Sequence, residues 1–256
     1  QYATAIPIGT AVAQSWNPAL AEALGDLVGA EMDRFGAHLW LAPAFNLHRS
    51  ILCGRNFEYF SEDPLLAGAQ VAEEIQGAQA KGVYAFIKHF ALNDQETNRT
   101  HMLSTWTNEQ ALREVYLRPF EIGVKQGGAR AVMSAFNYIG TTYAGAHPEL
   151  LNTVLRQEWG FQGMVLTDYF AGYGYQNADQ ITRGGGDLML ATIDMPIATV
   201  NVQDAAGVTA LRNASHNILY TVANSWMYEN GQPEVTRNAW EYITWVVAGA
   251  AILALL

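Results

Sequence analysis

The chain has 256 residues, half of them apolar, and this is enough for one large domain with a substantial core. Its net charge is −10 and its basic residues are scattered, which argues against nucleic acid as a partner because no basic patch neutralises phosphates. The single cysteine, Cys53, excludes an intrachain disulfide and a multi-cysteine zinc site.

Short apolar runs alternate along the chain with segments of helical spacing. Each strand is expected where an apolar or β-branched run is bounded by turn residues, at 4–9, 38–43, 83–87, 129–135, 164–166 and 187–190. Helices are expected between them, at 18–35, 63–82, from 107 onward, 148–159 and 204–223. Large apolar residues form one face of the first long helix (Leu20, Leu27 and Phe35) and of the last one (Val208 and Leu211).

Strand and helix alternate without a second composition zone, which is typical of an α/β fold built from βα repeats, most simply a TIM-type (β/α)8 barrel. Six strands are visible where a closed barrel needs eight. We therefore expect a barrel over residues 1–225 that is incomplete at its N-terminus, followed by a linker at 226–239.

The C-terminal segment, residues 240–256, is the most apolar part of the chain. Aromatic residues from Trp240 to Trp245 lead into eleven uncharged residues, 246–256, and this order resembles an interfacial belt before a membrane span. The pattern predicts a C-terminal apolar helix that crosses the membrane, although the run is shorter than the roughly 20 residues of a typical span. The predicted location is then the cell membrane with the preceding α/β domain outside, and the alternative is a buried terminal helix.

Polar side chains recur where the predicted strands end. Lys88, His89, Asn137 and Asp168 hold these positions, and at the carboxyl ends of parallel strands they would converge on one rim. Neighbouring loops add further charged residues, namely Arg55, Glu58, Asp94, Glu96 and Arg99. Each group also has a structural interpretation, because a strand-end Asp can cap a helix and a Lys–His or Arg–Glu pair can stabilise a loop.

No cofactor or metal is predicted. The six histidines lack metal-ligand spacing, and neither HExxH nor CxxC is present. The glycine pattern that begins at Gly172 lacks the third glycine of a dinucleotide fingerprint and its βαβ context.

Several longer motifs are similar to those of glycoside hydrolase family 3. They occur in the family's order over residues 1–225, and the longest of them, GRNFEYFSEDP at 54–64, is highly specific. The others are NLHR at 46–49, KHF at 88–90, NDQE at 93–96, MSAFN at 133–137, LRQEWGF at 155–161 and VLTDY at 165–169.

The resemblance implies a retaining β-glycosidase, chiefly a β-glucosidase, whose nucleophile is Asp168. It places Arg55, Lys88 and His89 on the sugar's hydroxyl groups, with Arg99 as a further candidate, and the nearby positive charges are expected to keep Asp168 ionised. The substrate-binding shell would also include Met133, Phe136 and Tyr169, although Met133 and Phe136 suit core packing as well. Family members usually carry Tyr at the position of Phe136 and Trp at the position of Tyr169.

A retaining mechanism also needs an acid/base carboxyl about 5–5.5 Å from the nucleophile. In the family this Glu generally comes from a separate α/β sandwich domain. The expected partners are therefore a β-glucoside or oligosaccharide substrate, the missing barrel strands and the sandwich domain of the same protein, and without them the fragment is expected to be inactive. The layout resembles the family's permuted, membrane-anchored arrangement.

Two alternatives remain open at this point. A strand-end lysine in a barrel also suits a class I aldolase, with Lys88 as the Schiff-base amine. A catalytically degenerate barrel, retained for sugar binding or membrane attachment, is the alternative without enzymatic activity, and Phe136 is the residue that favours it.

Overall fold

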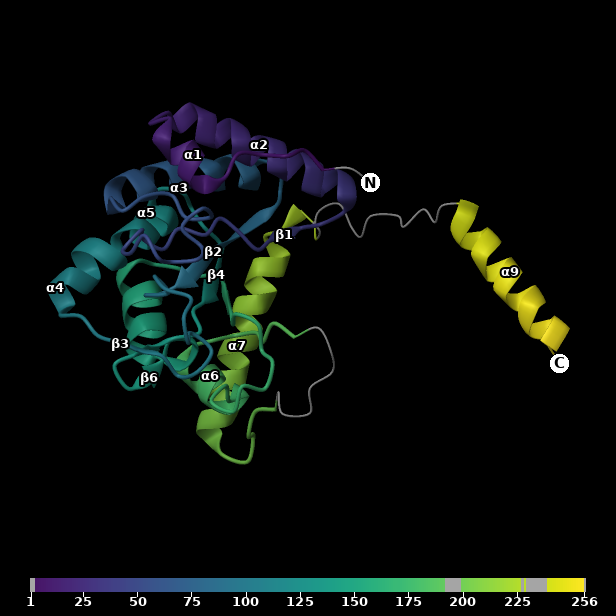
Figure 1. The fold of residues 1–256 in the computed structure, drawn as a ribbon. Helices are drawn as coiled ribbons and strands as arrows, with labels where there is room; N and C mark the ends of the chain where they lie inside the picture. Colours follow the sequence, from purple (N-terminus) through teal and green to yellow (C-terminus); the bar gives the residue numbers. More distant parts are fainter. Residues whose placement is uncertain (1–2, 192–198, 227, 229–238, 256) are drawn as a thin grey trace.

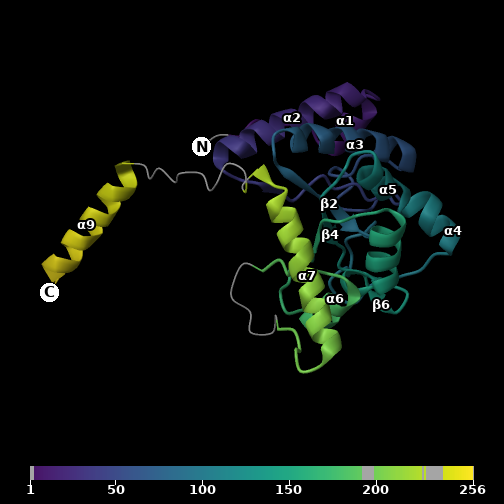
Figure 2. The ribbon, with the colours of Figure 1, turned by 180° about the vertical axis from the view of Figure 1, so that it is seen from behind.

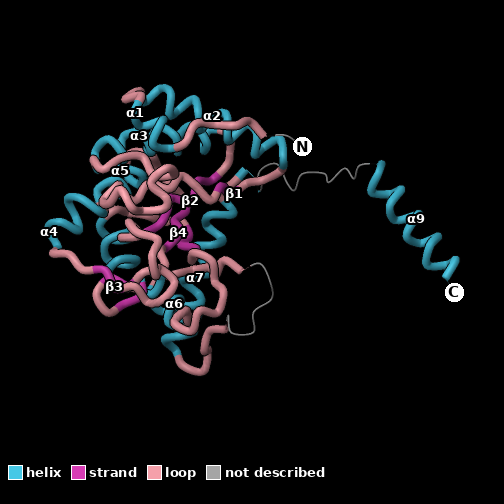
Figure 3. Tube along the Cα trace, viewed as in Figure 1, coloured by secondary structure: helices cyan, strands magenta, loops and turns pink. Residues whose placement is uncertain are grey.

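The protein is described by a computed structural model over residues 3–191, 199–226, 228 and 239–255 (Figure 1). Its centre is a parallel four-stranded sheet in the order β1-β2-β4-β7. The strands are short, and Figure 3 shows them grouped in the middle of the molecule. Their bounds are Leu39–Trp40 (β1), Tyr84–Phe90 (β2), Ala131–Ser134 (β4) and Met164–Leu166 (β7).

The sheet is open and does not close into a barrel. The pairing continues at Ala44 beside Lys88, and at Leu188 beside Leu166, so that segment 187–190 contributes a single bridge and no full strand. The strand predicted at 4–9 is wrong, since this segment leads directly into helix α1 (Gly9–Gln14). The α/β class with parallel strands is confirmed, whereas a closed eight-stranded barrel is not found among the described residues.

Helices cover both faces of the sheet. On one face, Ile87, Val132 and Val165 belong to the main core cluster together with residues of three helices, α3 (Pro64–Ala80), α5 (Arg118–Lys125) and η3 (Glu149–Glu158). On the other face, strand residues including Phe86 and Leu166 form a second cluster, against which Ile218 of α7 (Ala205–Ala223) packs. Figure 2 shows α7 running beside β2 and β4.

Helices α2 (Pro18–Phe35) and α3 pack through small residues. Ala21, Gly25 and Gly29 are the buried residues of α2. A Cβ atom on Gly25 would lie 2.1 Å from the backbone oxygen of Glu74, so the two backbones approach too closely for larger residues. The predicted apolar face is therefore only partly correct. Leu24 of that face packs against the main core cluster, whereas Leu20, Leu27 and Phe35 are exposed.

The predicted face of α7 is also only partly correct. Its buried residues are Gly207, Ala214 and Thr221; Ile218 of the predicted face packs against the second core cluster, while Val208 and Leu211 are 50% and 40% exposed. The predicted start is confirmed, because the Asp204 carboxylate accepts a hydrogen bond from the Gly207 N–H at 2.6 Å.

The middle of the chain forms a second, smaller sheet and several short helical turns. Strands β3 (Ser104–Thr105), β5 (Tyr138–Ile139) and β6 (Thr142–Tyr143) make this sheet. The helical stretch predicted from 107 onward is capped by Asn108, whose side chain accepts from the Ala111 N–H at 2.8 Å. The remaining elements are α4 (Glu109–Ala111), η1 (Leu112–Tyr116), η2 (Ala144–Ala146) and α6 (Ala178–Gly184).

Helix α9 (Ala239–Leu255) forms where an apolar C-terminal helix was predicted. Its large side chains are exposed, among them Trp245 at 71% and Leu253 at 75%. Its 17 residues rise about 25 Å, less than the roughly 30 Å hydrocarbon core of a bilayer. None of the helices described is both long and apolar enough to cross a membrane, so the transmembrane prediction for 240–256 is not supported. Most of the predicted linker at 226–239 lies outside the described residues.

Candidate active site

Asp168 lies two residues beyond the end of β7, the strand that carries it to the rim of the sheet. Its backbone N–H donates to the Ser134 carbonyl oxygen at 3.2 Å, which extends the pairing of β7 with β4 past the last strand residue. The side chain is 14% exposed. Its Oδ1 accepts from the Tyr169 N–H at 2.7 Å, and its Oδ2 accepts from Arg99 Nη1 at 3.3 Å.

His89 is the second polar group against Asp168. Its Nε2 lies 3.6 Å from Asp168 Oδ2 and 3.1 Å from Arg55 Nη1. Because a guanidinium can only donate, Nε2 accepts from Arg55 and the ring proton sits on Nδ1, which faces Asn46 Oδ1 at 3.3 Å. Burial, helped by the surrounding cations, holds the pKa of His89 well below its ordinary value. A neutral His89 in this tautomer gives Asp168 no hydrogen bond, so Arg99 is the side-chain donor to its Oδ2.

Arg55 and Lys88 meet at the Glu58 carboxylate. Arg55 Nη2 lies 2.6 Å from Glu58 Oε2, and Lys88 Nζ lies 3.5 Å from Glu58 Oε1. Lys88 is on β2 and Arg55 is in the loop before α3, so Glu58 fixes a loop cation to a strand cation. Burial lowers the pKa of Lys88, and the charge of Glu58 acts against this shift.

Loop 93–99 carries the groups that complete the site. Arg99 Nε lies 2.8 Å from Glu96 Oε2, and Glu96 Oε1 lies 3.9 Å from Arg55 Nη1. The loop is held to the body by the buried Asp94, whose Oδ1 accepts from the Leu47 N–H at 2.7 Å. Burial raises the pKa of Asp94 to about 7.

The remaining predicted site residues lie in different places. Phe136 is buried under Arg99, whose guanidinium carbon is 4.7 Å from the ring centre. Tyr169 is partly buried directly after Asp168. Met133 lies in the core cluster that packs against α7, which agrees with the structural interpretation of this residue.

Burial is the dominant influence on Asp168. It raises the pKa of this carboxyl above the ordinary value, while the Tyr169 N–H and the charges of Arg99, Lys88 and Arg55 lower it. The positive neighbours lower the pKa of Asp168 but do not outweigh desolvation, so the expectation that they keep this carboxyl ionised is not confirmed. The convergence of Lys88, His89 and Asp168 follows from their strand ends, and the Arg55–Glu58 ion pair matches the structural interpretation of these two residues. The contact of Glu58 with Lys88 and the linking role of Glu96 were not predicted. Their signal was present as acidic residues three positions from Arg55 and Arg99.

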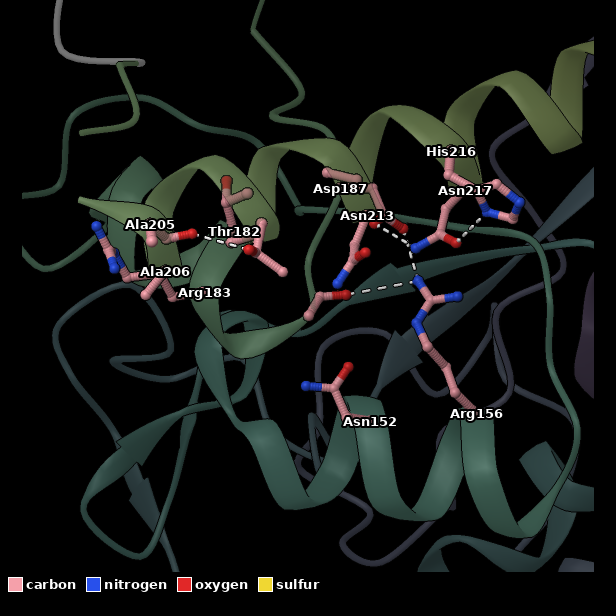
Figure 4. A pocket seen from close by; sticks show the side chains of 14 residues that line it. Asn152, Arg156, Thr182, Arg183, Asp187, Ala205, Ala206, Asn213, His216 and Asn217 are labelled. Carbon is pink, nitrogen blue, oxygen red and sulfur yellow. Dashed lines mark hydrogen bonds and ion pairs between the residues drawn. The ribbon is translucent and has the colours of Figure 1, made fainter. Parts of the chain in front are cut away.

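A separate cavity of about 570 Å³ lies between η3, α6 and α7 (Figure 4). None of the residues lining it belongs to the cluster around Asp168. Its lining includes the ion pair between Arg156 Nη2 and Asp187 Oδ2, at 2.7 Å. Over the described parts of the chain, no group of three or more His, Cys, Asp and Glu side chains could hold a metal ion.

Comparisons with known proteins point in one direction. Residues 1–210 match the family described as "Glycosyl hydrolase family 3 N terminal domain". A beta-glucosidase from Rhizobium radiobacter is 45% identical over 178 residues, which are 70% of this chain and 21% of that protein. Beta-glucosidase B from Emericella nidulans is 38% identical over 233 residues, 89% of this chain and 27% of that protein.

Solved structures agree. Beta-glucosidase 3B from Thermotoga neapolitana, in complex with glucose, superposes with a TM-score of 0.79 at 39% identity, over 89% of this chain and 33% of that one. The chain thus spans roughly a fifth to a third of the length of these relatives. Because the family match covers most of the chain, the conclusion is direct: this protein belongs to glycosyl hydrolase family 3.

Proposed function

We propose that the chain carries the nucleophile of a retaining β-glucosidase, which cleaves terminal β-glucosidic bonds. The observation that carries the proposal is the state of Asp168. Within the described part of the chain its Oδ2 has one side-chain donor, Arg99, and it lies on the rim of a parallel sheet among the cations of Arg55 and Lys88. The names of the relatives support the substrate class.

The first chemical step would form a glycosyl ester on Asp168. A carboxylate oxygen attacks the anomeric carbon, the bond to the leaving oxygen breaks, and that oxygen takes a proton from a general acid. In the second step water attacks the same carbon, the acid's conjugate base accepts the water proton, and Asp168 is released. Arg55 and Lys88 would hold sugar hydroxyl groups through their several N–H donors.

The general acid requires a further carboxyl group. Glu96 is the carboxylate that shares Arg99 with Asp168, but both of its oxygens face guanidinium groups, which suits an acceptor and not a proton donor. We therefore propose that the acid/base Glu comes from another segment of the full-length protein, such as the α/β sandwich domain that the family resemblance predicts.

The direct test uses a 2-deoxy-2-fluoro β-glucoside with a good leaving group on the full-length enzyme. The fluorine slows the second step, so the glycosyl ester accumulates and peptide mass spectrometry locates it. The expected label is on Asp168. A label on any other residue, or turnover without a label, would reject Asp168 as nucleophile.

A binding protein is the second candidate, and Phe136 is the observation that favours it. This buried ring has no hydroxyl group to place beside the nucleophile. Calorimetry with glucose, combined with turnover of an aryl β-glucoside by the complete protein, separates the two functions. Binding without turnover would favour a sugar-binding remnant.

A further inference from the structure

Glu96 is an unassigned acidic residue between the two arginines of the candidate site. Its side chain is about a quarter exposed, and it comes from loop 93–99, opposite the end of β7. Its Oε2 lies 2.8 Å from Arg99 Nε, and Asn93 Nδ2 donates to its Oε1 at 3.4 Å. The carboxylate is thus fixed on both oxygens before any substrate is present.

Arg99 is held from three sides, and only one of its contacts is with Asp168. Glu96 binds its Nε edge, the Phe136 ring lies 4.7 Å from its guanidinium carbon, and Asp168 Oδ2 accepts from its Nη1 at 3.3 Å. A cation is attracted to the face of an aromatic ring, but the ring does not fix the rotation of the guanidinium in its plane. The hydrogen bond to Nε does fix it, because the donors of a guanidinium form a rigid fork.

We propose that Glu96 is a positioning residue for the nucleophile. By holding Arg99 against the Phe136 ring, it aims Nη1 at Asp168 Oδ2 and keeps this cation in place while the carboxylate is free to attack. This inference rests on the proposed function. It assigns control of the charge on Asp168 to Glu96, a residue that does not touch the reacting atoms.

The direction in which loss of Glu96 shifts the pKa of Asp168 distinguishes a positioning role from a simple effect of its charge. A negative charge near Asp168 would by itself raise the pKa of that carboxyl, so its removal would lower the pKa. Loss of the Arg99 clamp does the opposite, because the Arg99 charge lowers the pKa of Asp168. The two explanations therefore predict shifts in opposite directions for one substitution.

The test compares Glu96→Ala, Glu96→Gln and wild type in the full-length enzyme. The pH dependence of inactivation by an activated 2-fluoro glucoside reports the nucleophile. We expect the acid limb of Glu96→Ala to move to higher pH and kcat/KM to fall about tenfold or more, as for loss of a hydrogen bond between charged groups. Glu96→Gln keeps an acceptor for Arg99 Nε and should lie between the two.

Glu62→Ala is the matched control, since it removes the same charge from an exposed residue before α3 and should leave the profile unchanged. An acid limb that stays in place or moves to lower pH in Glu96→Ala would overturn the positioning role. Activity of Glu96→Ala that is restored by azide would also overturn it, by marking Glu96 as the acid/base. Absence of glucosidase activity in wild type would instead reject the proposed function itself.

Discussion

Two aspartates with buried carboxylates lie at opposite ends of strand β7, and their hydrogen bonds differ. Asp187, near the start of the strand, has both oxygens occupied. Oδ2 accepts from Arg156 Nη2 and from the Val165 N–H, both at 2.7 Å, and Oδ1 accepts from Asn217 Nδ2 at 2.9 Å. At the other end, Asp168 accepts two hydrogen bonds from the residues that the structure describes: Oδ1 accepts from the Tyr169 N–H at 2.7 Å, and Oδ2 accepts from Arg99 Nη1 at 3.3 Å.

The difference separates a carboxylate that holds the fold from one that is available for chemistry. Burial raises the pKa of both groups and a neighbouring arginine lowers it, so electrostatics alone does not distinguish them. Hydrogen-bond saturation does. Asp187 joins η3, β7 and α7, while Asp168 keeps an oxygen with spare acceptor capacity at the rim.

The largest expected effect is that of Asp168→Asn on activity. We expect kcat for an aryl β-glucoside to fall by roughly a thousandfold or more, because an amide does not form the glycosyl ester. Stability should change by less than about 1 kcal/mol, since the group is underbonded and its ionisation is opposed by burial. Rate assays and urea denaturation on the full-length enzyme measure both quantities, and retained hydrolysis would remove the distinction between the two aspartates.

Asp187→Asn, unlike Asp168→Asn, should cause a large loss of stability. Three donors point at this side chain, and an amide offers one acceptor oxygen, so at least one donor would face an NH2 group and Arg156 would lose its counter-charge. We expect a loss of about 3–5 kcal/mol in unfolding free energy. Asp179→Asn, in a partly exposed ion pair with Arg183, is the control and should cost less than about 1 kcal/mol. Equal losses for both variants would argue against saturation as the source of the stability.

The sequence predicts the chemistry of the strand ends better than that of the loops. Lys88, His89 and Asp168 converge because the carboxyl ends of parallel strands share one rim, which follows from short apolar runs alone. For Arg55 and Arg99 the local pattern indicates only nearby loop charges, and their roles were assigned through the family motifs. Their positions depend on contacts between distant segments, such as Asp94 with Leu47, that local patterns do not contain.

Helix faces and sheet closure were predicted less well, for physical reasons. Amphipathic spacing favoured Leu20 and Val208 as core residues, but α2 approaches α3 through glycines and α7 buries Gly207 and Ala214. Backbone approach over small residues thus overrides the larger apolar stripe. The predicted strand at 187–190 reduces to one bridge because Asp187 turns its carboxylate into the sheet to meet the Val165 N–H.

Glu74 is a third buried carboxyl, and it differs from both aspartates in its hydrogen bonding. Its Oε2 has no hydrogen-bond partner among the residues that the structure describes, and burial raises the pKa of the group to about 8. The folded state therefore binds a proton that the unfolded state releases near pH 4.5, and stability falls as the pH rises from there to about 8.

We expect Glu74→Gln to remove this slope. Between pH 5 and pH 8 the wild type should lose roughly 3 kcal/mol more unfolding free energy than the variant. Urea denaturation at several pH values measures the difference. Glu73→Gln, at the neighbouring position of α3, controls for the loss of one charge, and parallel curves for wild type and Glu74→Gln would show that Glu74 has no such role.

The smallest expected effect comes from Phe136→Tyr, which tests whether the spare capacity of Asp168 limits the rate. Arg99 touches both the Phe136 ring and Asp168 Oδ2, so the ring and the carboxylate are neighbours. A hydroxyl group on this ring would offer Asp168 a second donor and restore the residue that family members usually carry. We expect kcat to rise by up to about fivefold, equivalent to the roughly 1 kcal/mol of one hydrogen bond.

Phe57→Tyr makes the same chemical change on a ring that is 56% exposed, and it should leave kcat unchanged. An unchanged or lower kcat in a stably folded Phe136→Tyr enzyme would show that the single contact from Arg99 already suffices, and that underbonding marks Asp168 as the reactive group without limiting how fast it reacts.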